Sequence, residues 1–397
     1  MNRLDVSKVR APLTLRHSLR KAFHMKKGTA PDLDWSKPTL PIEILELIVS
    51  FVEGHKELLT LAYTCSSLKD AAYKGIYKEV FISSTKQTGF LVILHKSLSN
   101  RRIAALVTTL RFHVSHFSLC EKGVSRFNRQ RRCICMKWNQ KFAAVVMNMP
   151  NLRSLDIEQF TSEEVMGEWV STLASPSITQ LQLLRFRCYS MTRDTMANLN
   201  KILAEPYMQS LKALYIPSQF FAEGLFSRSK ALPNLTTICD DGCSDMPNIY
   251  ADQQITRVIL TSVTSQSLLY IRRSQTNLTY LCTEYSRGSL LKLVVQNLDI
   301  LTNLRHLGIL WFPHDSVAPI LSGVGFLSPL SKLSSLELST PVHLDADPDF
   351  THFQVNLPTL VQIIYNGAMW RFNEGEWKQN RVMLTPWDVV NMELDPV

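Results

Sequence analysis

A short apolar pattern, L-x-x-L-x-apolar, recurs along most of this 397-residue chain and constrains its fold more than any other feature. Complete copies stand at Leu152/Leu155/Ile157, Ile178/Leu181/Leu183, Leu211/Leu214/Ile216, Ile255/Val258/Leu260, Leu304/Leu307/Ile309 and Leu333/Leu336/Leu338. Shorter copies stand at Leu235/Ile238, Leu278/Leu281 and Leu360/Ile363, and a candidate first copy at Val107/Leu110/Phe112. Each copy is expected to be one short strand that stacks on its neighbours and continues one core.

The middle residues of the copies lie 20 to 33 residues apart, which is typical of leucine-rich repeats with one longer insertion, between Leu181 and Leu214. The chain is therefore expected to be α/β, with an irregular leucine-rich-repeat solenoid whose helices or loops, such as 162–174, lie outside the strands. Pro–Asn–Leu at 150–152 and 233–235 places a turn just before a strand. The alternative is an α/β domain that contains unrelated LxxL strings.

Solenoids usually bind partners with the inner, concave strand face, and side chains alternate along a strand. The polar and aromatic residues that flank the apolar ones are therefore candidates for substrate binding. They are Asp156, Glu158, Gln182, Tyr215, Arg257, Tyr280, Glu284, His306 and Glu337. A charged residue on an exposed strand is also often only solvated.

The segment 38–82 reads as a small helical module. Its apolar residues Ile44, Leu45, Leu47, Ile48 and Phe51 mark one wide helical stripe, and Pro41 suits a first helical turn. Two further short helices are expected at 57–62 and around 68–72. Because three helices in about 40 residues make a marginal core, surplus apolar surface on this module would need a partner.

The module resembles an F-box. The resemblance rests on L-P-I-E-I-L at 40–45, followed by Ile48, Phe51, Leu58, Leu61, Ala62, Cys65 and Leu68. Leu68 stands near the place where many members of that family carry Trp, and the spacer VEGHKE lacks the frequent D-P. Together with the repeats, the chain is similar to fungal-type F-box proteins with leucine-rich repeats. The alternative is an ordinary helical subdomain that caps the next domain.

This resemblance implies a substrate-recognition subunit of an SCF-type cullin–RING E3 ubiquitin ligase, in which the repeats recruit a protein substrate. The F-box would dock on a Skp-type adaptor. By similarity, the adaptor contacts would be Leu40, Pro41, Ile44, Leu45, Ile48, Leu58 and Leu61. Two alternatives remain: a protein-binding scaffold that acts without ubiquitin transfer, and a nucleic-acid-associated protein that uses its basic segments.

Motifs for catalysis and cofactors are not found in the sequence. It contains no Walker-type loop, G-x-G-x-x-G, H-E-x-x-H or G-x-S-x-G, so we expect no enzyme and no cofactor. His113, His116, Cys120, Cys133 and Cys135 lie close together in sequence. Because their spacing matches no standard zinc motif, incidental thiols and histidines are expected here and no metal site.

The net charge of +9 belongs to two appendages. Residues 1–37 carry +6 and an insertion at about 121–141 carries another +6, which leaves −3 for the remainder. The first is expected to be a disordered basic tail, although it weakly resembles a mitochondrial presequence. The second is expected to be a solvated loop or else an electrostatic patch. A nucleic-acid-binding repeat body is not expected.

The remaining features concern location and the end of the chain. No run of about 18 apolar residues occurs, so no membrane span is expected. Eight cysteines in a chain of this length indicate reduced thiols in the cytoplasm or the nucleus. The repeat region would extend over 83–397, and Trp370, Trp377 and Trp387 near its end would form either a cap or a binding lip.

Overall fold

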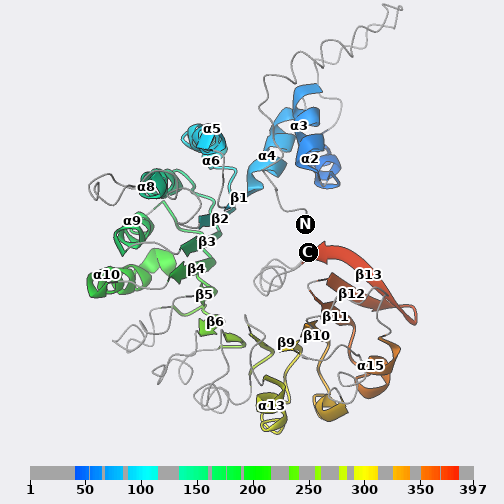
Figure 1. Cartoon of the computed structure of the whole chain (residues 1–397). Helices are drawn as coiled ribbons and strands as arrows, with labels where there is room; N and C mark the ends of the chain where they lie inside the picture. The colour runs from blue at the N-terminus through cyan, green and yellow to red at the C-terminus, as the bar shows by residue number, and fades with distance from the viewer. Residues whose placement is uncertain are drawn as a thin grey trace, which may run out of the picture. The chain divides into compact units, whose positions relative to one another are not determined.

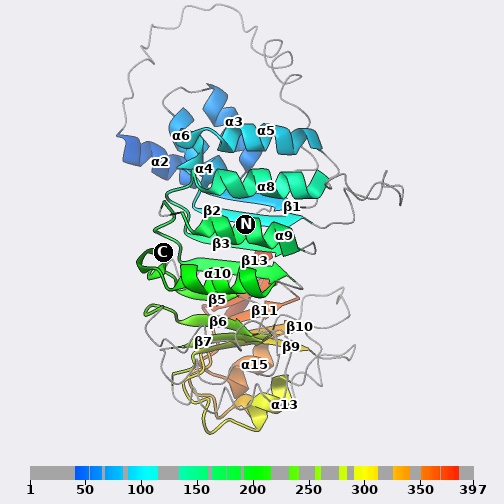
Figure 2. The same cartoon turned by 90° about the vertical axis from the view of Figure 1, so that its left-hand side faces the viewer.

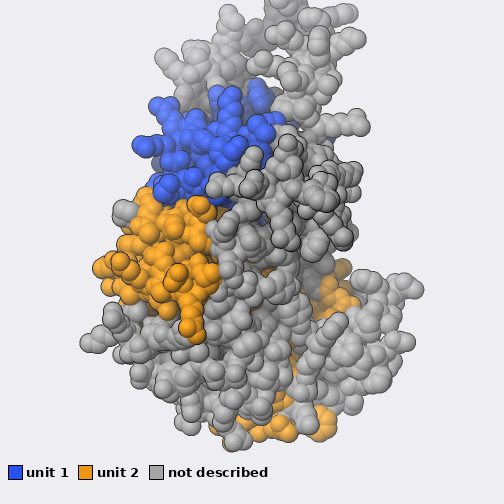
Figure 3. Space-filling view, turned by 60° about the vertical axis from the view of Figure 1, so that its left-hand side comes forward, with its two compact units in different colours: residues 1–152 blue, residues 153–397 orange. Residues whose placement is uncertain are grey.

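The computed structural model describes a mixed α/β protein with helices and a long open sheet (Figure 1). The described residues are 41–52, 54–64, 68–83, 88–114, 134–159, 163–175, 177–188, 192–215, 232–240, 255–260, 277–283, 290–311, 325–339, 350–366 and 368–383. The chain divides into two compact units, residues 1–152 and 153–397, coloured separately in Figure 3. Each unit is described by itself.

The first unit begins with the three expected helices, α2 (Ile42–Ser50), α3 (His55–Thr64) and α4 (Lys69–Lys78). Pro41 occupies the N-cap of α2, where a missing N–H costs nothing. Val49, Leu58 and Ala71, one from each helix, form a buried cluster. Partly buried apolar residues surround that cluster, namely Val52, Leu61, Leu68 and Ile76. All three helices therefore contribute apolar side chains to this small core.

The rest of the first unit contains β1 (Glu79–Ser83), α5 (Thr88–Leu98), α6 (Arg101–Ala104), β2 (Thr109–Val114) and α8 (Ile134–Val146). β1 and β2 pair in parallel, with Val80 opposite Leu110 and Ile82 opposite Phe112. The expected helical module therefore ends earlier than residue 82, because 79–82 already belong to a strand. The candidate first copy of the repeat, Leu110 and Phe112, is a strand with both side chains fully buried.

The second half of the predicted basic insertion is not a loop. Residues 134–141 open the helix α8, in which Trp138 and Phe142 are buried. The Phe142 ring lies 5.4 Å from the Phe112 ring, which ties the helix to β2. The Lys141 ammonium lies 4.8 Å from the Trp138 ring, so the basic residue covers an aromatic face. Charge alone could not reveal this apolar helix stripe.

The second unit is an array of parallel strands in chain order. They are β3 (Ser154–Gln159), β4 (Leu183–Cys188), β5 (Ala213–Tyr215), β6 (Thr237–Asp240), β7 (Arg257–Leu260), β8 (Tyr280–Thr283), β9 (His306–Trp311), β10 (Ser335–Ser339) and β11 (Gln362–Tyr365). Outside the strands lie α9 (Glu163–Leu173), α10 (Arg193–Leu203), α13 (Leu290–Val295) and α15 (Thr351–Asn356), with short 3₁₀ turns η2 (Pro206–Met208) and η4 (Gly325–Leu327). Figure 2 shows α9 and α10 side by side along this outer surface.

The register of these strands aligns the middle residues of the predicted copies. Leu155, Leu184, Leu214, Ile238, Val258, Leu281, Leu307, Leu336 and Ile363 stand in one row, and all are buried. One member differs from the prediction, because the second copy is centred on Leu184 and not on Leu181. Leu181, Leu183 and Leu184 stand almost adjacent, so the pattern could be read in two registers. In the observed register, no long insertion separates this copy from Leu214.

A second difference concerns β9. Leu338 of β10 pairs with Leu310 and not with the predicted Ile309, and the register shifts between Leu336 and Leu338. Two residues of β9, Gly308 and Ile309, therefore stand opposite the single residue Glu337. This arrangement is a β-bulge, which re-aims side chains locally and is frequent near functional sites.

The predicted Pro–Asn–Leu turns also link each copy to the one before it. The Asn234 side-chain amide donates to the Gln209 carbonyl at 2.7 Å, and the Asn151 amide donates to the Ala105 carbonyl at the same distance. Because such bonds satisfy backbone carbonyls in the segments that lead into β5 and β2, the turn residues join each copy to the one before it.

Two antiparallel strands follow the parallel array. β12 (Ala368–Asn373) pairs with β11, and β13 (Glu376–Met383) pairs with β12 through a tight turn in which Glu374 and Gly375 both have positive φ. Phe350 contacts both tryptophan rings of this hairpin, Trp370 at 5.4 Å and Trp377 at 5.9 Å. These two tryptophans therefore pack as a cap over the last parallel strand, whereas Trp387 lies outside the described residues.

Candidate functional site

Helix α2 has two apolar faces. Leu45, Val49 and Val52 point into the module, where Leu45 and Val49 are buried. A second row, Ile44, Leu47, Ile48 and Phe51, is exposed to solvent, with Phe51 exposed by 77%. Their spacing of i, i+3, i+4 and i+7 places them on one side of the helix. We call these four residues the α2 stripe.

Other residues of the module's surface are apolar or paired. Ile42 on α2 and Tyr63 on α3 are also well exposed, and Lys74 of α4 forms an ion pair with Glu46 of α2 at 2.9 Å. A helix that exposes four large apolar side chains in one row presents a surface suited to a partner. On α2 the face made by Leu45, Val49 and Val52 builds the module's core, and the α2 stripe lies in solvent.

The predicted adaptor contacts fall into two groups. Pro41, Ile44 and Ile48 are exposed, as a contact surface requires, and Leu61 is half-buried. The prediction was wrong for Leu45 and Leu58. Both side chains are buried in the module's own core, so neither is available to a partner. Leu40 lies outside the described residues.

Leu47, Phe51, Ile42 and Tyr63 were missing from the predicted contacts, although Leu47 and Phe51 belong to the predicted stripe. The helical spacing could have found Leu47 and Phe51, which share a face with Ile44 and Ile48. Residues 45, 49 and 52 share one face and 44, 47, 48 and 51 share the other. With both faces apolar, only the packing of α3 and α4 decides which is buried.

Most of the predicted substrate-binding residues lie on one face of the second unit's sheet, the face away from its helices, which we call the inner face. One row holds Ser154, Leu183, Ala213, Thr237, Arg257, Tyr280, His306, Ser335 and Gln362. The next holds Asp156, Arg185, Tyr215, Cys239, Ile259, Cys282, Glu337 and Ile364. Strand alternation therefore placed Asp156, Tyr215, Arg257, Tyr280, His306 and Glu337 correctly.

Their exposure was predicted wrongly. Asp156, Tyr215, Tyr280, His306 and Glu337 are all at least nine-tenths buried, so they do not form an open binding surface. The physical reason is an apolar cluster on the inner face that contains Leu183, Ala213, Tyr215, Cys239, Ile259, Tyr280, Cys282, Ile364 and Met369. Glu158 and Arg257 are half-buried, Gln182 precedes β4 and is half-buried, and Glu284 lies outside the described residues.

Among the described residues, this cluster takes no member from β9 or β10. Neighbouring strands lie about 4.8 Å apart, so β8 and β11 are separated by about 14 Å along the sheet. The cluster members lie along the inner side of the arc that Figure 1 shows for β3 to β11. The inner face is a second core of this unit.

Charged residues at one end of the inner face pair between adjacent strands. Arg185 Nη1 lies 3.1 Å from Asp156 Oδ2, and both side chains are 8% exposed. Arg187 Nη1 lies 3.0 Å from Glu158 Oε1 in a more exposed position. The Arg185 guanidinium also lies 5.5 Å from the Tyr215 ring on the next strand. Asp156 and Glu158 therefore have arginine partners within the chain.

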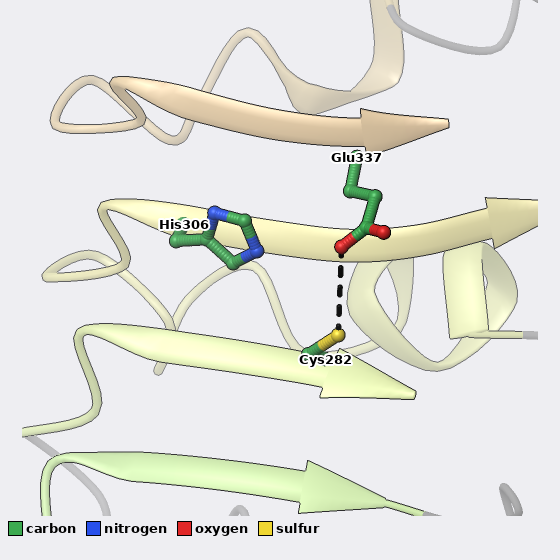
Figure 4. A group of neighbouring side chains, drawn as sticks. All are labelled: Cys282, His306 and Glu337. Carbon is green, nitrogen blue, oxygen red and sulfur yellow. Dashed lines mark hydrogen bonds between the residues drawn. The ribbon is translucent and has the colours of Figure 1, made fainter. Parts of the chain in front are cut away.

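At the other end, Cys282 on β8, His306 on β9 and Glu337 on β10 come together (Figure 4). One donor atom from each residue lies within 4.8 Å of the others, and all three side chains are buried. Cys282 Sγ lies 3.9 Å from Glu337 Oε2. The His306 ring stacks on the Tyr280 ring at 4.2 Å with an angle of 7°, and its Nδ1 lies 2.9 Å from Ser335 Oγ.

Burial controls the protonation of this cluster. Desolvation raises the pKa of Glu337 to about 8, although the hydrogen bond from Cys282 opposes the shift. Desolvation lowers the pKa of His306 to about 3, and the positive charge of Arg257 acts in the same direction. In the metal-free protein at neutral pH, the imidazole and the carboxyl group are therefore both uncharged.

The other candidate elements of the sequence are only partly described. His116, Cys120 and Cys133 lie outside the described residues, and His113 stacks edge-on against Phe81 at 5.2 Å. The basic residues of 121–133 and the tail 1–37 also lie outside them. Among the described residues, no helix combines the length and the apolar content that a membrane crossing requires.

Comparison with known proteins does not assign the chain to a family. No family model and no curated protein matches it. The chain is similar to a chain in the crystal structure of the Rad7 and Elc1 complex in yeast, with 12% identity and a TM-score of 0.39. That similarity covers 89% of this chain and 93% of the other. At this TM-score the similarity decides neither fold nor function.

Proposed function

We propose that this chain is the non-catalytic substrate-recognition subunit of an SCF-type cullin–RING ubiquitin ligase. Helices α2 to α4 would be its F-box module, and the strand array would be an irregular leucine-rich-repeat solenoid that recruits a protein substrate. The α2 stripe carries this proposal, because it is a row of apolar side chains on a module whose sequence resembles an F-box.

The physical argument concerns the free energy of the exposed row. Burying one large apolar side chain contributes about 1.5–3 kcal/mol, so the four residues of the α2 stripe could contribute several kcal/mol to association. An amphipathic helix that presents positions i, i+3, i+4 and i+7 typically docks into an apolar groove. A Skp-type adaptor is the partner that the resemblance at 40–68 implies.

The role of such a subunit is positional. Holding the adaptor with one module and a substrate with another raises the effective concentration of the substrate near a ubiquitin-carrying enzyme. The cytoplasm and the nucleus are the compartments proposed for it. Because most of the inner face is buried, we expect the substrate to contact the outer surface or the strand edges, not Asp156, Tyr280 or Glu337.

The test is co-purification of the full chain with a Skp-type adaptor. Ile44→Asp with Ile48→Asp should abolish the complex, because two charges would enter an apolar interface. Val92→Asp with Ile93→Asp on α5 is the matched control, since both side chains are exposed by 53% but lie outside the α2 stripe. Equal binding by both double variants, or no adaptor with the wild type, would contradict the proposal.

The same purification separates the alternatives. If the adaptor binds and no cullin joins it, the chain is a scaffold that acts without ubiquitin transfer. If no adaptor binds and the chain instead shows a steeply salt-dependent affinity for DNA or RNA, the basic segments carry its function.

A further inference from the structure

We propose that Cys282, His306 and Glu337 form a binding site for one divalent transition metal ion, with Zn²⁺ as the best fit. The site would join three consecutive strands, β8, β9 and β10, from their inner face. It is independent of the adaptor surface on α2 and goes beyond the function proposed above.

The spacing of the three donors suits a shared ion. Ligand atoms that bind one tetrahedral Zn²⁺ at about 2.0–2.3 Å lie about 3–4 Å from one another. Cys282 Sγ and Glu337 Oε2 are already 3.9 Å apart, and all three donors fall within 4.8 Å. Small side-chain rotations are therefore enough to place the three donors around one ion, with a fourth position left for water.

His306 provides an independent observation. Its ring is 98% buried, and its Nε2 has no hydrogen-bond partner among the described residues. A buried polar atom without a partner costs about 1–3 kcal/mol, so natural proteins rarely keep one without a purpose. In Figure 4 this edge of the imidazole faces the Glu337 carboxyl group. An ion at this point would supply the missing partner.

The other ring nitrogen holds the imidazole in position. Nδ1 lies 2.9 Å from Ser335 Oγ, and Tyr280 stacks on the ring face. If Nδ1 donates its proton to the Ser335 hydroxyl oxygen, Nε2 keeps a free lone pair that points at the other two donors. Metal-binding histidines are usually oriented by such a second bond.

Gly308 keeps the space between the donors open. It is the residue of β9 that stands between Cys282 on one side and Glu337 on the other. A side-chain carbon at Gly308 would lie 2.5 Å from Glu337 Cβ, 2.9 Å from Glu337 Oε2 and 3.2 Å from His306 Nε2. The bulge of β9 at this point places two residues opposite Glu337. Only a glycine leaves the donors this close to the strand.

The donor set selects the ion. One thiol, one imidazole and one carboxyl group favour Zn²⁺ over Mg²⁺ or Ca²⁺, which prefer oxygen ligands. Binding would displace the thiol proton of Cys282 and the carboxyl proton of Glu337 to solvent. A dication with one thiolate and one carboxylate has no net charge, which is the charge state that a buried site tolerates best.

The experiment uses the full chain after chelation and removal of the chelator. Zn²⁺ binding is measured by calorimetry, and Co²⁺ replaces it as a spectroscopic probe, because thiolate-bound Co²⁺ gives a ligand-to-metal charge-transfer band. We expect the wild type to bind one molar equivalent of the metal ion, and Cys282→Ala and His306→Gln to lack this bound ion. Zn²⁺ should also raise the Tm of the wild type, because the ion binds the folded state.

Cys239→Ala is the matched control, because Cys239 is a buried cysteine in the same row of the inner face. It should retain that equivalent, and Ser335→Ala should bind about tenfold or more weakly. Circular dichroism shows which variants are folded. The binding of Zn²⁺ and Co²⁺ by the wild type tests the site even if a variant does not fold. Absence of the charge-transfer band from the wild type, or its persistence in Cys282→Ala, would overturn the proposal.

Discussion

The Arg185 guanidinium lies 3.1 Å from the Asp156 carboxylate, and the two residues are a register pair that joins β4 to β3. Both side chains are 8% exposed. Taking such charges out of water is expensive, and each one depends on the other to offset that cost. The pair therefore fixes which residues of the two strands stand opposite each other more than it adds stability.

The first prediction concerns that pair. Arg185→Met should lower the free energy of unfolding by about 3–5 kcal/mol, because it leaves a buried carboxylate without its cation. The double variant with Asp156→Leu should recover most of the loss. Urea denaturation measures both. The Arg187–Glu158 pair is the control: its side chains are about 20% exposed, so Arg187→Met should cost clearly less. Equal costs would contradict the argument from burial.

The second prediction concerns Gly308. In the metal-free protein, Gly308→Ala should lower the free energy of unfolding by about 1–3 kcal/mol, since its new methyl group would overlap Glu337. Gly325→Ala is the matched control, because in the described part of the chain no residue other than its chain neighbours comes within 4 Å of a side-chain carbon built there. Thermal unfolding of both variants in chelator measures the difference. If Gly308→Ala left the free energy of unfolding unchanged, β9 would have room for a side chain at this position.

The third prediction concerns pH. Because burial raises the pKa of Glu337 from 4.5 to about 8, the folded protein holds this proton more tightly than the unfolded chain does. Stability should therefore fall as pH rises from about 4.5 to 8, and Glu337→Gln should remove that fall. The groups close to Glu337, namely Cys282 and His306, and Arg257, whose charge acts on His306, all remain in the variant, so the difference isolates Glu337.

Denaturation in chelator at several pH values measures this dependence. The difference in stability between wild type and Glu337→Gln should change in favour of the variant as pH rises toward 8. A difference that stays constant over this interval would show that Glu337 titrates normally.

The fourth prediction separates the two faces of the helical module. Leu58→Ala should lower the free energy of unfolding of the first unit by about 2–5 kcal/mol, because it opens a cavity in the buried cluster. Phe51→Ser should change it by no more than about 0.5 kcal/mol, since Phe51 is 77% exposed. Phe51→Ser should nevertheless weaken adaptor binding. Chemical denaturation and adaptor capture provide the two readouts, and a large stability loss for Phe51→Ser would assign that face to the core.

Periodicity predicted much of the fold. The row from Leu155 to Ile363 could be read from the sequence because buried strand positions are apolar and recur once per repeat. The prediction from periodicity failed at Leu184 and Leu310. At both places several apolar residues stand close together in sequence, so two strand registers fit the pattern equally well. Helix α8 was missed for a related reason, because its basic residues hid the stripe that contains Trp138 and Phe142.

The sites were harder to predict than the strands. Alternation along a strand tells which residues share a face, so Asp156, His306 and Glu337 could be assigned to one face of the sheet. It does not tell whether that face meets water. The approach of Cys282 to Glu337 depends on a glycine and a register shift in the strand between them, and such three-dimensional details leave no periodic signal in the sequence.

The apolar cluster on the inner face has a consequence for how the second unit unfolds. In an array whose repeats touch only their sequence neighbours, terminal repeats can open one at a time. Here one buried apolar cluster takes members from β4 through to β12, so opening the last strands would expose cluster members on the strands that remain. The unit is therefore expected to unfold in a single cooperative transition. A truncated version without β11 to β13 would expose apolar core residues to water and would be prone to aggregate.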